Sequence, residues 1–307
     1  MRTDRALAAL SGPWLALPVL CLFLVAGRAA ADEPLQLTFG VYTSDKPTDM
    51  YRMFKPILVH LEGVMTKDLA RPVKIKLRVF NSYDAARKAL VSEEVDFVRF
   101  GPSSYILAKD ENPGVVLLAI EEQEGQFAFK GVIFARNDSG IDRIEDLRGK
   151  SFAFGDPDST IGRYLSQAYL VNKGIYAKDL LKYQYLDRHD RVVASVLGGD
   201  FDAGAAKEST FNKFRDQSPG LKALETFDNV TKPWVARSKL EPRLCEVVRK
   251  ALFALKDRKV LDAMGEKITG FVEAKDEMYK EVRVGMEKSS EFLKGPPPAS
   301  AKEATRD

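Results

Sequence analysis

The sequence predicts an α/β protein that folds into two lobes. Strand-like and helix-like segments alternate along most of the chain, a pattern typical of mostly parallel sheets covered by helices. Two long β segments, near 127–135 and 226–236, bracket a central block of such segments. A pair of this kind indicates two strands that cross between lobes. The expected fold is therefore two α/β lobes, with mostly parallel sheets, joined by a two-strand hinge.

Residues 1–31 are expected to form a signal peptide. Arg2 and Arg5 precede an apolar stretch that two prolines interrupt, and the small residues before Asp32 fit cleavage after Ala31. A retained membrane anchor is the alternative, and the prolines disfavour it. A lipoprotein anchored at Cys21 is disfavoured because a leucine stands where a small residue is needed. The expected location is the periplasm.

The mature chain carries little net charge. The leader contains three arginines and one aspartate, so its removal lowers the net charge from +3 to +1. This balance argues against a nucleic-acid-binding protein, and any recognition of charge must be local. With Cys245 as the one mature cysteine and two histidines in the chain, neither an internal disulfide nor a metal site is expected. No cofactor is expected either.

The first lobe is expected to comprise residues 32–130 and 233–294. Alternating or continuously apolar runs predict its strands, and apolar residues at helical spacing predict its helices. In chain order, its first part contains a strand at 35–44, a helix at 50–65, a strand at 73–80, a helix from 81 or 82, a strand at 96–100, a helix from 102 and a strand at 115–120. The returning part is expected to be helical from 241 to 293.

The second lobe is expected to comprise residues 131–232. Its segments are a long β run at 125–139, a short helix at 141–150, a strand at 151–154, a helix that ends at 174, a strand near 183–186, a helix from about 190, a strand at 201–206 and the β run that crosses back. Residues 295–307 are rich in proline, alanine and charge, and are expected to be a disordered tail.

Three strand-to-helix turns are rich in hydroxyl groups. They are NSYD at 81–84, GPSS at 101–104 and DPDST at 156–160. Each turn alone is explained by an ordinary helix N-cap. Ligands of open α/β sheets, however, bind beyond the carboxyl ends of the strands. Three such turns, divided between two lobes, therefore favour a site for a small tetrahedral oxyanion at converging helix N-termini.

The candidate ligand-binding residues come from these turns and from neighbouring strand ends. His189 follows a strand end and is either a satisfied surface histidine or a ligand contact. The aromatic candidates either belong to the core or wall off a ligand. Asp202 is either a solvated carboxylate or a ligand contact, and Glu208 pairs with a ligand amine or with a nearby lysine. The candidates are Tyr42, Tyr83, Phe100, Ser103, Ser104, Ser159, Thr160, Gly162, His189, Asp202 and Glu208.

The sequence resembles the periplasmic phosphonate- and phosphite-binding family of ABC transporters, which are type II periplasmic binding proteins. The resemblance rests on four segments in this order: FGPSSY, FAFGDPDSTIG, RHD around His189, and GDFDAGAAKES. It extends over nearly the whole mature chain to about Ser209, and more loosely over the helical end. It implies a monomer that is not an enzyme, whose two lobes close on a phosphonate, phosphite or phosphate ion, and an ABC permease as partner.

The resemblance also implies a role for particular residues. Ser159, Thr160 and the N–H groups beside them would hold the oxyanion, while His189 and Tyr83 correspond to a cleft histidine and a cleft tyrosine. Gly162 corresponds to the glycine that ends the Ser-Thr turn.

Two positions depart from the family pattern. Phe100 stands where a tyrosine is frequent, and Ile161 replaces a hydroxyl donor of the Ser-Thr turn. For an aminoalkylphosphonate, Asp202 or Glu208 would have to face the amine. Phosphate, phosphite, a small alkylphosphonate and another oxyanion such as arsenite therefore remain open.

Two other functions are compatible with such a fold. The first is a sensor, whose closed form docks on a histidine kinase or a chemoreceptor. The second is an enzyme on the same fold, as in pyrimidine-synthesising relatives, which would need a catalytic histidine or cysteine in the cleft. The sequence contains no phosphate-binding P-loop, G-x-S-x-G or H-E-x-x-H motif. Together with the leader, this argues against an enzyme, whereas transport and sensing differ only in the partner of the protein.

Overall fold

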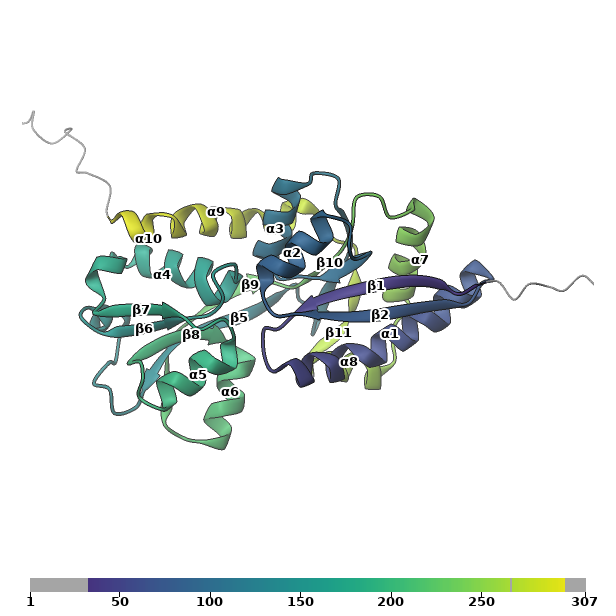
Figure 1. The fold of residues 1–307 in the computed structure, drawn as a ribbon. Coiled ribbons are helices and arrows are strands. Elements are labelled where there is room, and N and C mark those ends of the chain that lie inside the picture. Colours follow the sequence, from purple (N-terminus) through teal and green to yellow (C-terminus); the bar gives the residue numbers. More distant parts are fainter. Residues whose placement is uncertain (1–32, 266, 296–307) are drawn as a thin grey trace, which may run out of the picture. The chain divides into compact units, whose positions relative to one another are not determined.

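The computed structural model describes residues 33–265 and 267–295, and in this part of the chain helices cover both faces of two β-sheets (Figure 1). The sheet with the order β11-β4-β10-β3-β1-β2 and its helices are called the first lobe. The sheet with the order β7-β6-β8-β5-β9 and its helices are called the second lobe. The predicted two-lobed α/β fold is confirmed. The predicted leader and most of the predicted C-terminal tail lie outside the described residues.

The strands of the first lobe come from both ends of the chain. They are β1 (Leu35–Tyr42), β2 (Val73–Phe80), β3 (Phe97–Arg99), β4 (Val116–Gln123), β10 (Pro233–Ala236) and β11 (Ile268–Val272). β1 is parallel to β2 and β3, whereas β10 is antiparallel to β3 and β4, and β11 is antiparallel to β4. The expectation of helices throughout 241–293 was wrong at β11, a short run of β-prone residues.

Helices pack on both faces of the first sheet. α1 (Pro47–Leu69), α7 (Pro242–Phe253) and α8 (Arg258–Met264) share one core with this sheet, and α2 (Tyr83–Val91) and α3 (Pro102–Glu111) share another. The first core is centred on Trp234, whose ring stacks on Phe39 at 4.8 Å and meets Phe54 of α1 edge-on at 6.3 Å. Proline at the first position of α1, α3 and α7 suits a helix start, where the missing N–H costs nothing.

The second lobe has the same layered construction. Its strands are β5 (Ala128–Arg136), β6 (Ser151–Phe154), β7 (Lys182–Tyr185), β8 (Ala203–Lys207) and β9 (Leu221–Val230). Its helical segments are η1 (Ile144–Leu147), η2 (Thr160–Leu165), α4 (Ser166–Asn172), η3 (Ala177–Asp179), α5 (His189–Leu197) and α6 (Glu208–Gln217). β6 is parallel to β7 and β8, and β5 is antiparallel to β8 and β9.

Both sheets are therefore mixed, which corrects the expectation of mostly parallel sheets. The parallel pairs are those joined by helical crossovers within a lobe. The antiparallel pairs involve strands that enter a sheet from the other lobe, or that follow such a strand, because the chain then runs in the opposite direction. The chain crosses between β4 and β5 and again between β9 and β10.

The C-terminal helices pack on the second lobe. After η4 (Asp276–Tyr279), α9 (Lys280–Ser289) and α10 (Glu291–Lys294) run along α4, as Figure 1 shows. Phe292 is fully buried, with ring centroids 5.5 Å from Phe154 and 5.6 Å from Tyr183. This contact departs from the assignment of all of 233–294 to the first lobe. The chain thus passes between the lobes a third time.

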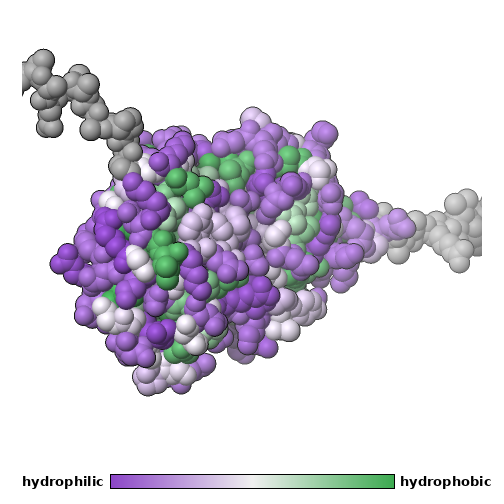
Figure 2. Space-filling model, turned by 60° about the vertical axis from the view of Figure 1, so that its left-hand side comes forward, coloured by the Kyte–Doolittle hydropathy of each residue, from purple (hydrophilic) through white to green (hydrophobic). Residues whose placement is uncertain are grey.

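The face of the molecule that Figure 2 shows is mostly polar. Its apolar residues lie in separate groups. In the part of the chain that the structure describes, no helix has the length and apolar character needed to cross a membrane.

Candidate functional site

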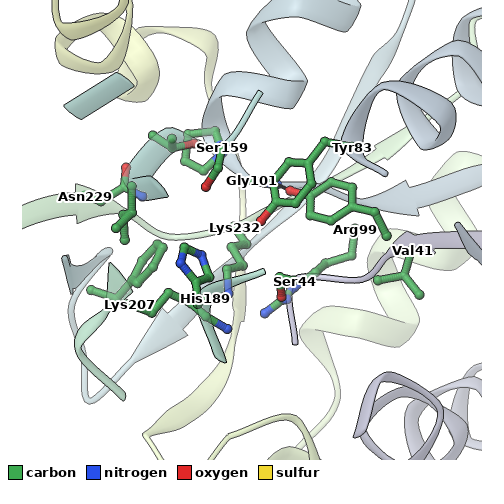
Figure 3. Close-up of a pocket in the computed structure, with 15 residues that line it drawn as sticks. Val41, Ser44, Tyr83, Arg99, Gly101, Ser159, His189, Lys207, Asn229 and Lys232 are labelled. Carbon is green, nitrogen blue, oxygen red and sulfur yellow. Dashed lines mark hydrogen bonds between the residues drawn. The ribbon is translucent and has the colours of Figure 1, made fainter. Parts of the chain in front are cut away.

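A small cavity of about 30 Å³ lies where the carboxyl ends of β1 and β3 face those of β6 and β8. This is the position where open α/β sheets bind ligands. Figure 3 shows side chains from both lobes gathered around it. The lining residues are Val41, Tyr42, Ser44, Tyr83, Arg99, Gly101, Pro102, Phe129, Ser159, Thr160, Ile161, His189, Lys207, Asn229 and Lys232.

Two stacked tyrosines form one wall of the cavity. The rings of Tyr42 and Tyr83 have centroids 3.6 Å apart, and both residues are buried. Burial raises the pKa of Tyr42 to about 12, so its phenol keeps its proton. The Tyr42 oxygen accepts a hydrogen bond from the N–H of Gly101, which leaves the tyrosine O–H free to donate. A side chain at Gly101 would collide with this oxygen, because a Cβ would lie 2.8 Å from it.

The DPDST turn supplies donors from the second lobe. Ser159 is the N-cap of the π-helical turn η2, and its Oγ accepts from the N–H of Gly162 at 3.0 Å. A hydroxyl that accepts in this way still has its own proton, so Ser159 can donate to the neighbouring Tyr83 or to a ligand. Among the described residues, no acceptor is found for the backbone N–H of Thr160 or of Ile161. These two N–H groups stand at the positive end of the helix that continues into α4.

The hydroxyl of Thr160 is used differently, because it joins the two lobes. Thr160 Oγ1 accepts from the N–H of Ser103 at 2.9 Å and lies 2.8 Å from Ser103 Oγ. Ser103 Oγ donates its single proton to the carbonyl of Asp158 at 2.6 Å. The proton between the two hydroxyls must therefore come from Thr160. The GPSS turn and the DPDST turn thus meet directly across the lobes.

His189 is buried beside the cavity at the start of α5. It is 3% exposed, and its backbone N–H donates to the carbonyl of Ser44 in the first lobe at 3.1 Å. Burial, together with the charges of Lys207 and Lys232, lowers the pKa of His189 to about 3, so the imidazole is neutral near pH 7. Its Nδ1 has no hydrogen-bond partner in the described part of the chain.

Two of the cations around the cavity have carboxylate partners. Arg99 donates to both oxygens of Glu121, at 2.7 and 2.9 Å, in a buried pair. Lys207 of the second lobe pairs with Asp45 of the first, which also accepts from Thr210 at 3.1 Å. Burial alone would raise the pKa of Asp45, but Lys207 lowers it to about 2.

Lys232 is a cation of a different kind. It lies on the segment that crosses from β9 to β10, and its Nζ is 4.9 Å from the centre of the Phe129 ring. Within residues 33–265 and 267–295, no carboxylate lies within ion-pair distance of it. Burial and the nearby Arg99 and Lys207 hold the pKa of Lys232 well below its usual value. A bound anion would stabilise its charged form.

The composition of the lining indicates the chemistry of the ligand. Hydroxyls, N–H groups, an amide, an imidazole and three cations line the cavity, and no carboxylate is among the lining residues. Such a set attracts an anion with several acceptor oxygens. It offers no counter-charge for an amine.

The predicted site residues fall into three groups. Tyr42, Tyr83, Ser159, Thr160 and His189 line the cavity.

The second group supports the lining without joining it. Ser103 holds Thr160, and Ser104 donates to the Tyr42 oxygen at 3.5 Å. Phe100 is fully buried and stacks on Tyr42 at 5.9 Å, so it backs the wall. Gly162 packs against Gly155, where a Cβ would lie 2.8 Å from the Gly155 Cα.

The two carboxylate candidates do not reach the cavity, which corrects their assignment. Asp202 precedes β8 and accepts from the N–H and Oγ of Ser151 at 2.8 and 2.6 Å. It therefore lies at the opposite end of β8 from Lys207, about 16 Å along the strand. Glu208 opens α6 and is not a lining residue.

The sequence argument missed Arg99, Lys207, Lys232, Asn229 and Phe129. Arg99 and Lys207 are the last residues of β3 and β8, directly before the turns that drew attention. Phe129, Asn229 and Lys232 lie on or beside the crossing strands. These residues could have been found from the sequence by looking for charged or amide residues in the segments that pass between the two lobes.

Two α/β lobes joined by crossing strands, with a buried donor-lined cavity at their strand ends, define a binding protein of the type II periplasmic class. The chain belongs to the family described as ABC transporter, phosphonate, periplasmic substrate-binding protein, whose sequence pattern matches residues 39–279. Members of this family are substrate-binding transport proteins of the periplasm.

Similar proteins agree with this assignment. Over 244 residues the chain is 25% identical to the probable ABC transporter phosphite binding protein PhnD1 of Prochlorococcus marinus, covering 72% of this chain and 81% of that one. It is 23% identical over 237 residues to the phosphate-import protein PhnD of Mycolicibacterium smegmatis, covering 72% of each chain. The solved structure of PhnD1 from Prochlorococcus marinus in complex with methylphosphonate has the same fold, with a TM-score of 0.72 at 22% identity, covering 84% of this chain and 99% of that one.

Proposed function

We propose that this protein captures a small phosphorus oxyanion, namely phosphonate, phosphite or phosphate, in the cavity between its lobes and delivers it to the membrane components of an ABC transporter. The observation that supports this most is the lining, which combines free donors with a cation that lacks a carboxylate partner. Residues 1–31 act as a signal peptide in this proposal, and the protein works in the periplasm as a monomer without enzymatic activity.

The proposed ligand-binding residues differ from the sequence-based set. Ser159, Tyr42 and the N–H groups of Thr160 and Ile161 donate to the oxygens of the anion. Lys232 supplies the charge. His189 and Asn229 complete the shell with their unpartnered polar atoms. Without a lining carboxylate, an aminoalkylphosphonate gains nothing from its amine.

A thermal-shift screen of the mature protein tests this proposal. The protein is unfolded and refolded to remove carried ligand, then heated with phosphate, phosphite, methylphosphonate, aminoethylphosphonate, arsenite, arsenate or sulfate. A ligand at about one hundred times its Kd adds about 2.7 kcal/mol of stability, which raises the Tm visibly. We expect the phosphorus oxyanions to raise the Tm, and aminoethylphosphonate to do no better than methylphosphonate.

Sodium chloride at matched ionic strength controls for general salt effects. If none of the tested anions raises the Tm of well-folded protein, the proposed ligand class is wrong. A sensor for the same anion would give the same panel. Stimulation of the ATPase activity of the reconstituted transporter by the liganded protein separates transport from sensing.

A further inference from the structure

The amide of Asn229 has no hydrogen-bond partner in the part of the chain that the structure describes. Asn229 is 3% exposed and lines the cavity, and among the described residues neither its Nδ2 nor its Oδ1 finds a hydrogen-bond partner. Because both atoms lack partners, the argument does not depend on which way the amide is turned. An unsatisfied buried polar group is costly, so this amide calls for a ligand that both accepts and donates.

The backbone fixes Asn229 firmly in this position. It lies directly opposite Phe129 in the β5–β9 ladder, so both side chains stand on the same face of the sheet. Lys232 lies three residues further along and places its Nζ over the Phe129 ring. The N–H of Thr231, between them, donates to the carbonyl of Phe127 at 2.9 Å. Asn229, Phe129 and Lys232 therefore form one wall of the cavity.

The Oδ1 of Asn229 needs a hydrogen-bond donor, and two kinds of tetrahedral anion differ in whether they supply one. A fully deprotonated anion such as sulfate presents acceptor oxygens alone, and would leave Oδ1 of Asn229 without a donor. A singly protonated oxyanion presents one hydroxyl. The other donors of the cavity, on Tyr42, Ser159 and the η2 backbone, serve its remaining oxygens.

The charges around the cavity point the same way. Arg99 and Lys207 are matched by Glu121 and Asp45, which leaves Lys232, whose charged form a bound anion stabilises, as one positive charge.

The other titratable groups that face the cavity add no further positive charge. His189 is neutral because of its low pKa, and the phenols of Tyr42 and Tyr83 keep their protons because burial raises their pKa. Asp156, whose pKa burial raises to about 6, is not one of the lining residues. A monoanion matches this balance, whereas a dianion leaves an excess negative charge in a buried site.

We propose that the cavity binds its oxyanion as the singly protonated monoanion, with the P–OH donating to Oδ1 of Asn229 and Lys232 balancing the single charge. This inference rests on the proposed function and adds the protonation state of the ligand to it. It makes Asn229 a specificity-determining residue that favours phosphorus oxyanions over sulfate.

The direct test is ³¹P NMR of methylphosphonate bound to the wild-type protein between pH 6.5 and 8.5. We expect the bound resonance to keep the chemical shift of the monoanion across this range, while the free ligand titrates. A bound resonance at the position of the dianion overturns the inference. This measurement needs no variant and so does not depend on the folding of one.

Two variants test the role of Asn229. Asn229→Leu removes both polar atoms, and we expect it to weaken methylphosphonate binding by about 10- to 100-fold. Sulfate binding should change by no more than a few-fold, so that the preference for methylphosphonate falls. The matched control is Asn172→Leu at the exposed end of α4, which should leave both affinities unchanged.

The outcomes separate the two proposals. If no phosphorus oxyanion binds to folded wild-type protein, the proposed function fails. If methylphosphonate binds as the dianion, or binds Asn229→Leu as tightly as wild type, the proposed function stands and this inference fails. The variant His189→Gln adds a check on which residue accepts the hydrogen bond from the P–OH. If Asn229 accepts it, the bound ligand should keep the chemical shift of the monoanion in this variant. If His189 accepts it, that chemical shift should be lost.

Discussion

At the scale of single residues, the two neighbouring hydroxyls of the DPDST turn have different roles. Ser159 accepts from Gly162 and has a proton to spare, whereas the proton of Thr160 is committed to Ser103 in the other lobe. The turn therefore caps its own helix and still presents donors to a ligand. The two roles follow from where each hydroxyl proton is directed, and not from the presence of the hydroxyls alone.

Single substitutions should separate these roles. Ser159→Ala removes a charge-assisted donor worth about 1.5–3 kcal/mol, so we expect ligand affinity to fall about 10- to 150-fold. Thr160→Ser retains the hydroxyl that contacts Ser103 and should bind nearly as wild type does. Titration calorimetry of both variants is the measurement. A larger loss in Thr160→Ser than in Ser159→Ala would contradict the assignment.

At the scale of elements, each lobe depends on segments from distant parts of the sequence. β10 lies between β3 and β4 in the first sheet, although more than a hundred residues separate it from either. The second lobe obtains part of its core from α10, where Phe292 contacts Phe154 and Tyr183. The C-terminal helix is therefore a structural part of the second lobe.

Neighbouring residues of α10 allow this role to be measured. Phe292→Ala should lower the free energy of unfolding by about 3–5 kcal/mol, because it removes a fully buried aromatic ring. Leu293→Ala is the control, since Leu293 is 65% exposed and its loss should change stability by about 0.5 kcal/mol or less. Urea unfolding of the ligand-free proteins provides both values. Equal effects of the two substitutions would argue against α10 as part of the core.

At the scale of the whole molecule, stability depends on pH through buried groups beside the cavity. Burial raises the pKa of Asp156 from 3.8 to about 6 in the folded protein. Because the folded value is higher, this group favours folding below pH 3.8, and the contribution is lost as the pH rises through 6. His189 acts in the opposite sense, because its low folded pKa removes stability as the pH falls below 6.5.

The Asp156 contribution can be tested by replacing the carboxyl with an amide. The rise in pKa corresponds to about 3 kcal/mol, so Asp156→Asn should stabilise the protein by up to that amount at pH 8 and by almost nothing at pH 4. Thermal unfolding of the variant and of wild type at both pH values is the measurement. The exposed Asp200→Asn should show no such pH-dependent difference. A constant difference across pH would contradict the burial of an ionised Asp156.

Much of this fold could be predicted from the sequence, because alternation and the two long β segments are local patterns. The direction of the crossing strands could not be predicted, since this direction depends on how β10 pairs within the first sheet. The same limit applies to the site. Ser159 and His189 follow strand ends and are visible as turn residues, whereas Asn229 and Lys232 become neighbours of the cavity only through the pairing of β9 with β5.

The three passages of the chain between the lobes also bear on how the protein is made. The first sheet cannot close until β10 has been synthesised, and the core of the second lobe lacks Phe292 until α10 has been synthesised. Domains generally fold as units while the chain emerges, but here each lobe needs a segment that follows strands of the other lobe in the chain. A nascent chain with this connectivity cannot complete its lobes one after the other in the order of synthesis.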